Sequence, residues 1–317
     1  MKKLKYDLRR AYQTLRGKKT DLSGIVLHAG DKGTWDSRWI LDPCVLRLGD
    51  KYYMWFTGYD GRHLRIGLAT SNNGRDWVKH PSNPLLDRGM PGAWDSSHVY
   101  NPCVVMVGDR LYMWYAGANV EKGGWQVQIG VAISRDGESW VKFSANPVLS
   151  PEEIWESHSV FGPCVLKIGG KYYMWYAGGE IPRGIGLATS GDGQTWVKYA
   201  SGLVLEGVPG TWEDVGMDRP CVITDGDMYY MYYSGIQGPY TRIGLAVSRD
   251  GRSWSKSSAN PVLDLGEGSW DDTFAADCWV MKMDSEYYMW YRGHDGKYSH
   301  LGLATSPDGV NWRKMKS

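Results

Sequence analysis

The stretch CVLKIGGKYYMWYAGGEIPRGIGLATSGDGQTW, residues 164–196, occurs in five versions along this chain of 317 residues. Each version begins with a cysteine, continues through an aromatic run and a small-residue run, and ends in a turn followed by tryptophan. A repeat with about four strand-like runs per unit is typical of a propeller blade. The sequence therefore predicts an all-β fold, a five-bladed β-propeller with four antiparallel strands per blade. The cysteines that begin the units are Cys44, Cys103, Cys164, Cys221 and Cys278.

The repeats define a single domain, because stacked units of this kind share a continuous core. We expect the propeller to occupy residues 23–317, with residues 24–27 closing the ring beside the last blade, and residues 1–22 to form a polar lead-in. The expected blades are approximately residues 35–86, 94–149, 155–205, 212–263 and 270–317.

Composition and charge favour a neutral partner. The chain has 36 basic and 35 acidic side chains, so neither nucleic acid nor an anionic membrane surface is an expected partner. Seventeen tryptophans and 21 tyrosines, against four phenylalanines, suit the apolar faces of sugars. The sequence leaves the oligomeric state open.

Localisation is predicted from the ends of the chain and from its cysteines. The charged start lacks the apolar core of a secretory signal, and no run approaches the ~20 apolar residues of a membrane span. Cysteines at equivalent positions of neighbouring blades are expected to lie too far apart to bridge, so five reduced thiols and a cytoplasmic location are predicted.

Positions where the blades differ carry the functional signal, because a single site in a near-symmetric ring must come from residues that break the symmetry. The residues just before each cysteine are expected to enter the innermost strand, which lines the central channel. Polar and charged groups replace one another there in an otherwise repeated phrase. The candidates from these segments are Asp42, Asn101, Phe161, Asp218, Arg219 and Asp277.

Further candidates are expected around the mouth of the channel. Trp39 could stack on a sugar ring, and the histidines of two adjacent connectors suit sugar binding or acid–base chemistry. Glu180 lies in a loop of the third unit, and Arg219, Arg65 and Arg242 could form a phosphate pocket. The histidines are His98 and His158 on the connectors and His294 on a rim loop.

The acidic residue that follows the connector tryptophan recurs in all five units, so we expect a structural role for it. These residues are Asp36, Asp95, Glu156, Glu213 and Asp271. No histidine pair has metal-ligand spacing, and no cofactor is expected to be required. A calcium ion held by Asp oxygens, or a phosphate, could bind in the channel.

On these motifs the chain resembles the five-bladed β-propeller glycosidases, which are glycoside hydrolase families 32, 43, 62 and 68 and the mannoside phosphorylases and hydrolases of family 130. Leu41-Asp42-Pro43 looks like the Asp-Pro motif that carries the nucleophile or general base in families 32 and 43. Asn101 falls at the second acidic residue of family 43. Phe161 falls where the resemblance implies the glutamate that acts as general acid, so the chain departs from that pattern.

The leading hypothesis is a glycoside hydrolase-like enzyme that cleaves a small oligosaccharide with inversion. Asp42 would be the base and Glu180, Asp218 or Asp277 the acid, at the ~6.5 to 9.5 Å separation of inverting enzymes. One alternative is a phosphorolytic enzyme of the family 130 type, with phosphate held by arginines. The other is a non-catalytic carbohydrate-binding propeller, because Asn101 and Phe161 replace acidic residues.

Overall fold

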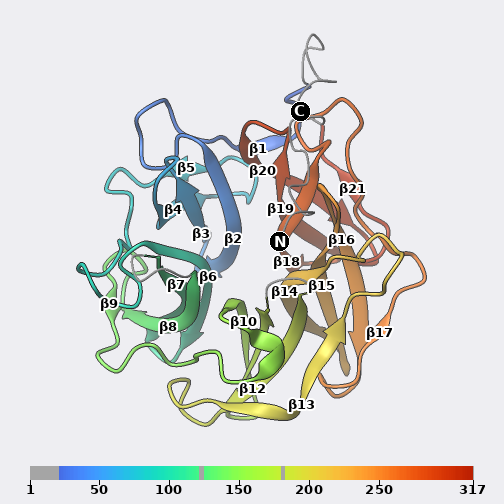
Figure 1. The fold of residues 1–317 in the computed structure, drawn as a ribbon. Helices are drawn as coiled ribbons and strands as arrows, with labels where there is room; N and C mark the ends of the chain where they lie inside the picture. Colours follow the sequence, from blue (N-terminus) through green and yellow to red (C-terminus); the bar gives the residue numbers. More distant parts are fainter. Residues whose placement is uncertain (1–20, 121–124, 180–182, 317) are drawn as a thin grey trace, which may run out of the picture.

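The computed structural model describes residues 21–120, 125–179 and 183–316. Five groups of strands surround a common central axis, and their colours follow the sequence around the ring (Figure 1). This arrangement confirms the prediction of an all-β, five-bladed propeller. In the described part of the chain the non-strand element is a single turn of 3-10 helix, η1 (Ile154–Glu156).

Each blade is an antiparallel sheet of four strands that follow one another from the axis outward. Blade 1 contains β2 (Trp39–Leu48), β3 (Lys51–Tyr59), β4 (Leu64–Ser71) and β5 (Val78–Lys79), and blade 2 contains β6 (His98–Val107), β7 (Arg110–Asn119), β8 (Gln126–Ser134) and β9 (Val141–Lys142). Blade 3 contains β10 (Val160–Ile168), β11 (Lys171–Gly178), β12 (Gly184–Ser190) and β13 (Val197–Glu206). Blade 4 contains β14 (Gly216–Asp225), β15 (Met228–Gln237), β16 (Tyr240–Ser248) and β17 (Ser255–Lys256). Blade 5 contains β18 (Phe274–Met283), β19 (Glu286–His294), β20 (Ser299–Ser306) and β21 (Arg313–Lys314).

The two ends of the chain meet in blade 5. Strand β1 (Ile25–Leu27) pairs antiparallel with β20, so a segment from the start of the described chain lies against the last blade. The residues before Asp21, which include most of the predicted lead-in, lie outside the described residues.

An aromatic side chain on the second strand of each blade joins that blade to the next. The indole of Trp55 in blade 1 donates a hydrogen bond to the carbonyl of Gly137 in the closing turn of blade 2, at 2.9 Å. Trp290 of blade 5 donates in the same way to Gly74 of blade 1, which completes the ring. The equivalent bonds run from Trp114 to Gly193, from Trp175 to Gly251 and from the Tyr232 hydroxyl to Gly309.

The recurring acidic residues of the connectors are structural, as their recurrence predicts. Each is buried and forms an ion pair with the lysine that follows the closing tryptophan by two positions. The pairs are Asp36–Lys79, Asp95–Lys142, Glu156–Lys198, Glu213–Lys256 and Asp271–Lys314.

The innermost strand of every blade contains a bulge, and the bulge fixes which residue faces the channel. Pairing with the second strand shifts register at that point, and the first bulged residue has a left-handed backbone with φ between 49° and 57°. Such a conformation is strained for residues other than glycine and is concentrated at functional sites. The five residues are Asp42, Asn101, Gly162, Arg219 and Asp277.

Blade 5 departs from the predicted register by one residue. Trp279 pairs with Trp290 just as Cys44 pairs with Trp55, so Trp279 stands where the other four blades have their cysteine. Cys278 stands where they have proline, and the prediction that Cys278 marks the equivalent strand position is wrong. The cause is that blade 5 has no proline to show the register. Trp279 packs against the cores of four blade interfaces and lines the channel cavity.

Candidate functional site

A pocket of about 440 Å³ lies at the end of the propeller where the innermost strands begin. This volume falls within the range of small-molecule sites, roughly 300 to 1,000 Å³. Four aromatic side chains, Trp39, Tyr100, Trp125 and Phe161, form much of its wall. Three arginines, Arg183, Arg219 and Arg292, also line it.

A second, much smaller cavity lies inside the channel. Its lining includes the five bulged residues of the innermost strands, together with Trp279. Arg219 lines both spaces, whereas Asp42 and Asp277 line the channel cavity and are not part of the lining of the pocket.

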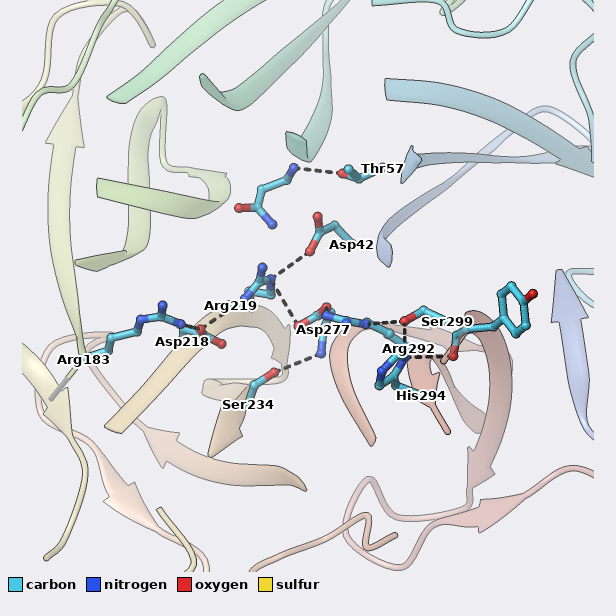
Figure 2. Close-up of polar contacts among 12 residues, drawn as sticks. Asp42, Thr57, Arg183, Asp218, Arg219, Ser234, Asp277, Arg292, His294 and Ser299 are labelled. Atoms are coloured by element: carbon cyan, nitrogen blue, oxygen red, sulfur yellow. Dashed lines mark hydrogen bonds and ion pairs between the residues drawn. The ribbon is translucent and has the colours of Figure 1, made fainter. Parts of the chain in front are cut away.

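Arg219 is the centre of an ion network within the channel (Figure 2). Its Nε donates to Asp42 Oδ1 at 2.8 Å and lies 3.1 Å from Asp277 Oδ1. Its Nη1 donates to Asp218 Oδ2 at 3.1 Å. The three carboxylates are almost fully buried, so they are compensated chiefly by arginine rather than by solvent.

Two further arginines extend the network to the pocket wall. Arg183 Nη1 donates to Asp218 Oδ2 at 2.7 Å, and Arg292 Nη1 donates to Asp277 Oδ2 at 3.2 Å. Three arginines therefore face three carboxylates, with the arginines on the pocket side.

Burial sets the protonation of this cluster. Burial raises the pKa of the Asp277 carboxyl above its ordinary value, against the lowering effect of Arg219 and Arg292, and the carboxylates of Asp42 and Asp218 raise it further. Burial lowers the pKa of the Arg219 guanidinium, but the three carboxylates more than reverse this, so the pKa lies well above its ordinary value. Arg219 therefore stays positively charged, and burial favours the protonated form of Asp277.

Phe161 supports the arginines instead of supplying an acid. The guanidinium carbons of Arg183 and Arg219 lie 5.3 Å and 5.8 Å from the centroid of its ring, within the range of cation–π contacts. The side chain is buried, with 6% of its surface exposed. The departure from the glycosidase pattern at this position therefore coincides with the presence of arginines on the pocket wall.

The histidines of the mouth are held by aromatic contacts and are neutral near pH 7. Burial, with a smaller effect of nearby cations, lowers the pKa of His98 and of His294 to about 4. His98 packs edge-on against Trp125, and His294 packs edge-on against Trp39. Both histidines therefore support a tryptophan of the pocket wall.

The structure brings six of the predicted residues together around the channel, adds Trp39 to the pocket wall with His98 and His294 packed against pocket tryptophans, and places the remaining predictions elsewhere. Asp42, Asn101, Phe161, Asp218, Arg219 and Asp277 lie around the channel and pocket, as the preceding contacts show. Arg65 forms an ion pair with Asp60, and its neighbour Leu64 lines the pocket instead, because side chains alternate between the faces of a strand. His158 is exposed, with Ser159 in the pocket lining, and Glu180 lies outside the described residues.

Sequence comparison of the innermost strands alone missed Arg183, Arg292 and Trp125. Arg292 pairs with Ala276 at a register position where the other second strands have Thr57, Ala116, Ala177 and Ser234. The same search for broken symmetry, applied to the second strands, would have identified Arg292.

No group of three histidine, cysteine, aspartate or glutamate side chains suited to a metal ion occurs in the part of the chain that the structure describes. The channel carboxylates contact arginine instead. Among the described residues no helix is long and apolar enough to cross a membrane.

Comparison with known proteins identifies the family. The family model described as beta-1,4-mannooligosaccharide phosphorylase, glycoside hydrolase family 130, matches residues 93–200 and 179–317. The chain belongs to glycoside hydrolase family 130. This assignment confirms the resemblance to the five-bladed propeller glycosidases and makes a carbohydrate-active enzyme the coarse description of the protein.

The chain is also similar to individual relatives and, in its fold, to solved structures. The chain is 30% identical to "Uncharacterized protein MT1551" of Mycobacterium tuberculosis (strain CDC 1551 / Oshkosh) over 81% of this chain and 88% of the relative. It is 23% identical to the "1,2-beta-oligomannan phosphorylase" of Thermoanaerobacter sp. (strain X514), over 67% of this chain and 92% of the relative. A solved structure described as "Glycoside hydrolase" superposes with a TM-score of 0.76 at 22% identity, covering 94% of this chain and 95% of that one.

Proposed function

We propose that this member of family 130 cleaves a β-mannoside by phosphorolysis, with inorganic phosphate as the attacking group. The observation that carries the proposal is the set of three arginines on the pocket wall, Arg183, Arg219 and Arg292. Arginine binds phosphate oxygens through paired N–H groups in a fixed planar geometry. This proposal takes up the phosphorolytic alternative and sets aside the hydrolytic hypothesis.

The spacing of Asp42 and Asp277 argues against these two residues as the acid and base of an inverting hydrolase. An inverting hydrolase keeps its acid and base ~6.5 to 9.5 Å apart, with a water molecule beside the base. Here Asp42 Oδ1 and Asp277 Oδ1 lie 2.8 Å and 3.1 Å from the same nitrogen of Arg219, so these oxygens are closer together than that separation. Phosphorolysis needs a proton donor but no carboxylate base, because hydrogen phosphate is itself the nucleophile.

The proposed mechanism also needs a proton donor to the leaving oxygen. Among the described carboxyls, Asp277 is the one to test first, because burial raises its pKa. A general acid contributes roughly 10²- to 10⁴-fold to the rate. Glu180, which the sequence predicts as a proton donor, lies outside the described residues and stays a prediction.

The aromatic wall supports a carbohydrate substrate. Trp39 stacks on Tyr59 at 4.7 Å between ring centroids and packs against His294, so its ring is held in place. Trp125 is 51% exposed in the pocket lining and packs against His98. Rigid aromatic faces of this kind suit the apolar faces of sugar rings.

The test is to incubate the purified protein with β-1,2- and β-1,4-mannobiose, with and without inorganic phosphate, and to identify the products. The expected result is mannose 1-phosphate, formed only when phosphate is present. Arg292→Met should weaken the dependence of rate on phosphate concentration, whereas Arg242→Met is a matched control because Arg242 pairs with Asp264 outside the pocket lining. Release of free mannose at the same rate with and without phosphate would contradict the proposal.

A further inference from the structure

Arg219 lies between the pocket and the carboxylates that would activate water. It lines both the pocket and the channel cavity, whereas Asp42 and Asp277 line only the cavity. We propose that Arg219 selects the nucleophile: it holds Asp42, the predicted base, on the channel side, so that phosphate rather than water attacks the sugar. This inference rests on the proposed phosphorolysis and concerns a residue that sets its specificity.

The contacts of Asp42 show how Arg219 would keep this carboxylate from activating water. A general base must lie within hydrogen-bond reach of the water whose proton it takes. Asp42 Oδ1 accepts from Arg219 Nε at 2.8 Å, and Asp42 Oδ2 is buried without a hydrogen-bond partner among the described residues. The guanidinium thus holds one oxygen of Asp42, and the carboxylate lies outside the lining of the pocket, where a general base for a water molecule bound there would have to lie.

Several contacts keep Arg219 in this position. Its backbone is left-handed at φ 49° and is followed by Pro220, whose ring restricts the conformation of the preceding residue. Its stem passes the bulge of blade 3, where Gly162 has no side chain. A Cβ on Gly162 would lie 3.4 Å from the Arg219 Cα and 3.5 Å from its Cγ. The ring of Phe161 covers the guanidinium from another side.

The two reactions differ in what supplies oxygen and proton. In phosphorolysis an oxygen of hydrogen phosphate bonds to the anomeric carbon, the glycosidic C–O bond breaks, and the leaving oxygen takes a proton from the enzyme acid. The proton of hydrogen phosphate then restores that acid. In hydrolysis the oxygen of water bonds to the anomeric carbon, one of its protons passes to a carboxylate base, and the leaving oxygen is protonated as before. Only the second route needs an accessible Asp42.

The decisive variant is Arg219→Lys. A lysine keeps one positive charge but presents a single ammonium, which cannot contact the three carboxylates through separate nitrogens. With mannobiose and inorganic phosphate, we expect the ratio of free mannose to mannose 1-phosphate to rise by about 10²-fold over wild type, a typical general-base contribution. Adding Asp42→Asn in the same protein should remove most of the new free mannose while mannose 1-phosphate still forms.

Each outcome of this experiment bears on the inference. A wild-type product ratio in Arg219→Lys, or free mannose that persists in the Asp42→Asn double variant, overturns it. If Arg219→Lys does not fold, as near-ultraviolet circular dichroism would show, Arg219→Met with Asp218→Asn removes one cation and one buried anion together, keeps Asp277, and is held to the same criterion. Arg242→Met should keep the wild-type ratio.

The wild-type arm separates failure of the proposed function from failure of this inference. Free mannose from the wild-type protein without phosphate contradicts both phosphorolysis and the selection of the nucleophile by Arg219. Strict phosphate dependence in the wild type, with an unchanged ratio in the Arg219 variants, leaves phosphorolysis intact and removes only the role of Arg219.

Discussion

At the scale of single residues, the site depends on side chains that break the fivefold symmetry. Asp42, Asn101, Gly162, Arg219 and Asp277 share one backbone conformation, so their chemistry differs while their placement does not. A polar residue at such a position costs strain, which is consistent with a functional role. The charge balance of the channel is therefore set by side-chain identity alone.

Trp125 offers a test of substrate length at this scale. Its half-exposed ring lies on the pocket wall, and we expect it to stack on a sugar residue beyond the cleaved bond. Trp125→Ala should raise KM for a mannotriose about tenfold with little change in kcat, since ~1.4 kcal/mol of binding would be lost. Michaelis kinetics on mannobiose and mannotriose would measure this. Ile154→Ala, at a fully exposed side chain outside the pocket lining, is the control, and an unchanged KM for mannotriose would exclude the role.

The sequence alone identified four of these five bulge residues as candidates. The innermost-strand comparison found Asp42, Asn101, Arg219 and Asp277, because a residue that differs between otherwise repeated phrases is visible without a structure. It did not show that Asp42 is paired with arginine, since Arg219 reaches across the channel from blade 4 to blade 1. Long-range ion pairs of this kind depend on the closed ring and leave no spacing pattern in the chain.

At the scale of elements, the blades are joined by the second strand of one blade and the closing turn of the next. Four of these bonds come from indoles, and the bond from blade 4 comes from the Tyr232 hydroxyl, which donates to Gly309 at 2.9 Å. The aromatic runs of the sequence predicted these strands, and their bonds to the neighbouring blades explain why the aromatic residue and the turn glycine recur together.

The Tyr232 bond can be removed with little change in volume. Tyr232→Phe leaves the buried acceptor at Gly309 without this donor, and we expect the free energy of unfolding to fall by about 1 to 2 kcal/mol. Urea unfolding followed by tryptophan fluorescence would measure the change. Tyr240→Phe is a matched control because Tyr240 is 41% exposed. Equal stability of the two variants would show that this bond contributes little.

Register within the elements was the part that the sequence predicted least well. The cysteine and the proline before it define the bulge in four blades, but blade 5 has Asp277-Cys278-Trp279. The cysteine suggested one alignment, and strand pairing gives another, with Trp279 in the cysteine position. A shift of one residue reverses the face that every side chain occupies, so this detail required the pairing itself.

At the scale of the whole molecule, buried neutral histidines couple the fold to pH. Burial lowers the pKa of His98 and His294 to about 4, whereas an unfolded histidine titrates near 6.5. Between these values the unfolded chain binds more protons than the folded one. The stability that neutral histidine provides is therefore complete above about pH 6.5 and is lost as pH falls towards about 4.

This coupling predicts an acid-dependent loss of stability that a single substitution reduces. His294→Gln should lessen the fall in Tm between about pH 6.5 and 4, because it removes one group that binds a proton on unfolding. The contribution of each buried histidine is on the order of 2 kcal/mol across this range. His158→Gln is the control, since His158 is exposed. A wild-type pH profile in His294→Gln would contradict the prediction.

The shared left-handed bulge also has a consequence for how such a protein changes over time. The same backbone conformation carries aspartate, asparagine, glycine and arginine at five equivalent positions around one ring, so each position tolerates side chains of different charge. A single codon change at one of these bulge positions can alter the charge in the channel without changing the conformation of the strand. A scaffold of this kind can diverge in chemistry faster than in shape, and a designer could install a new reaction by choosing five side chains.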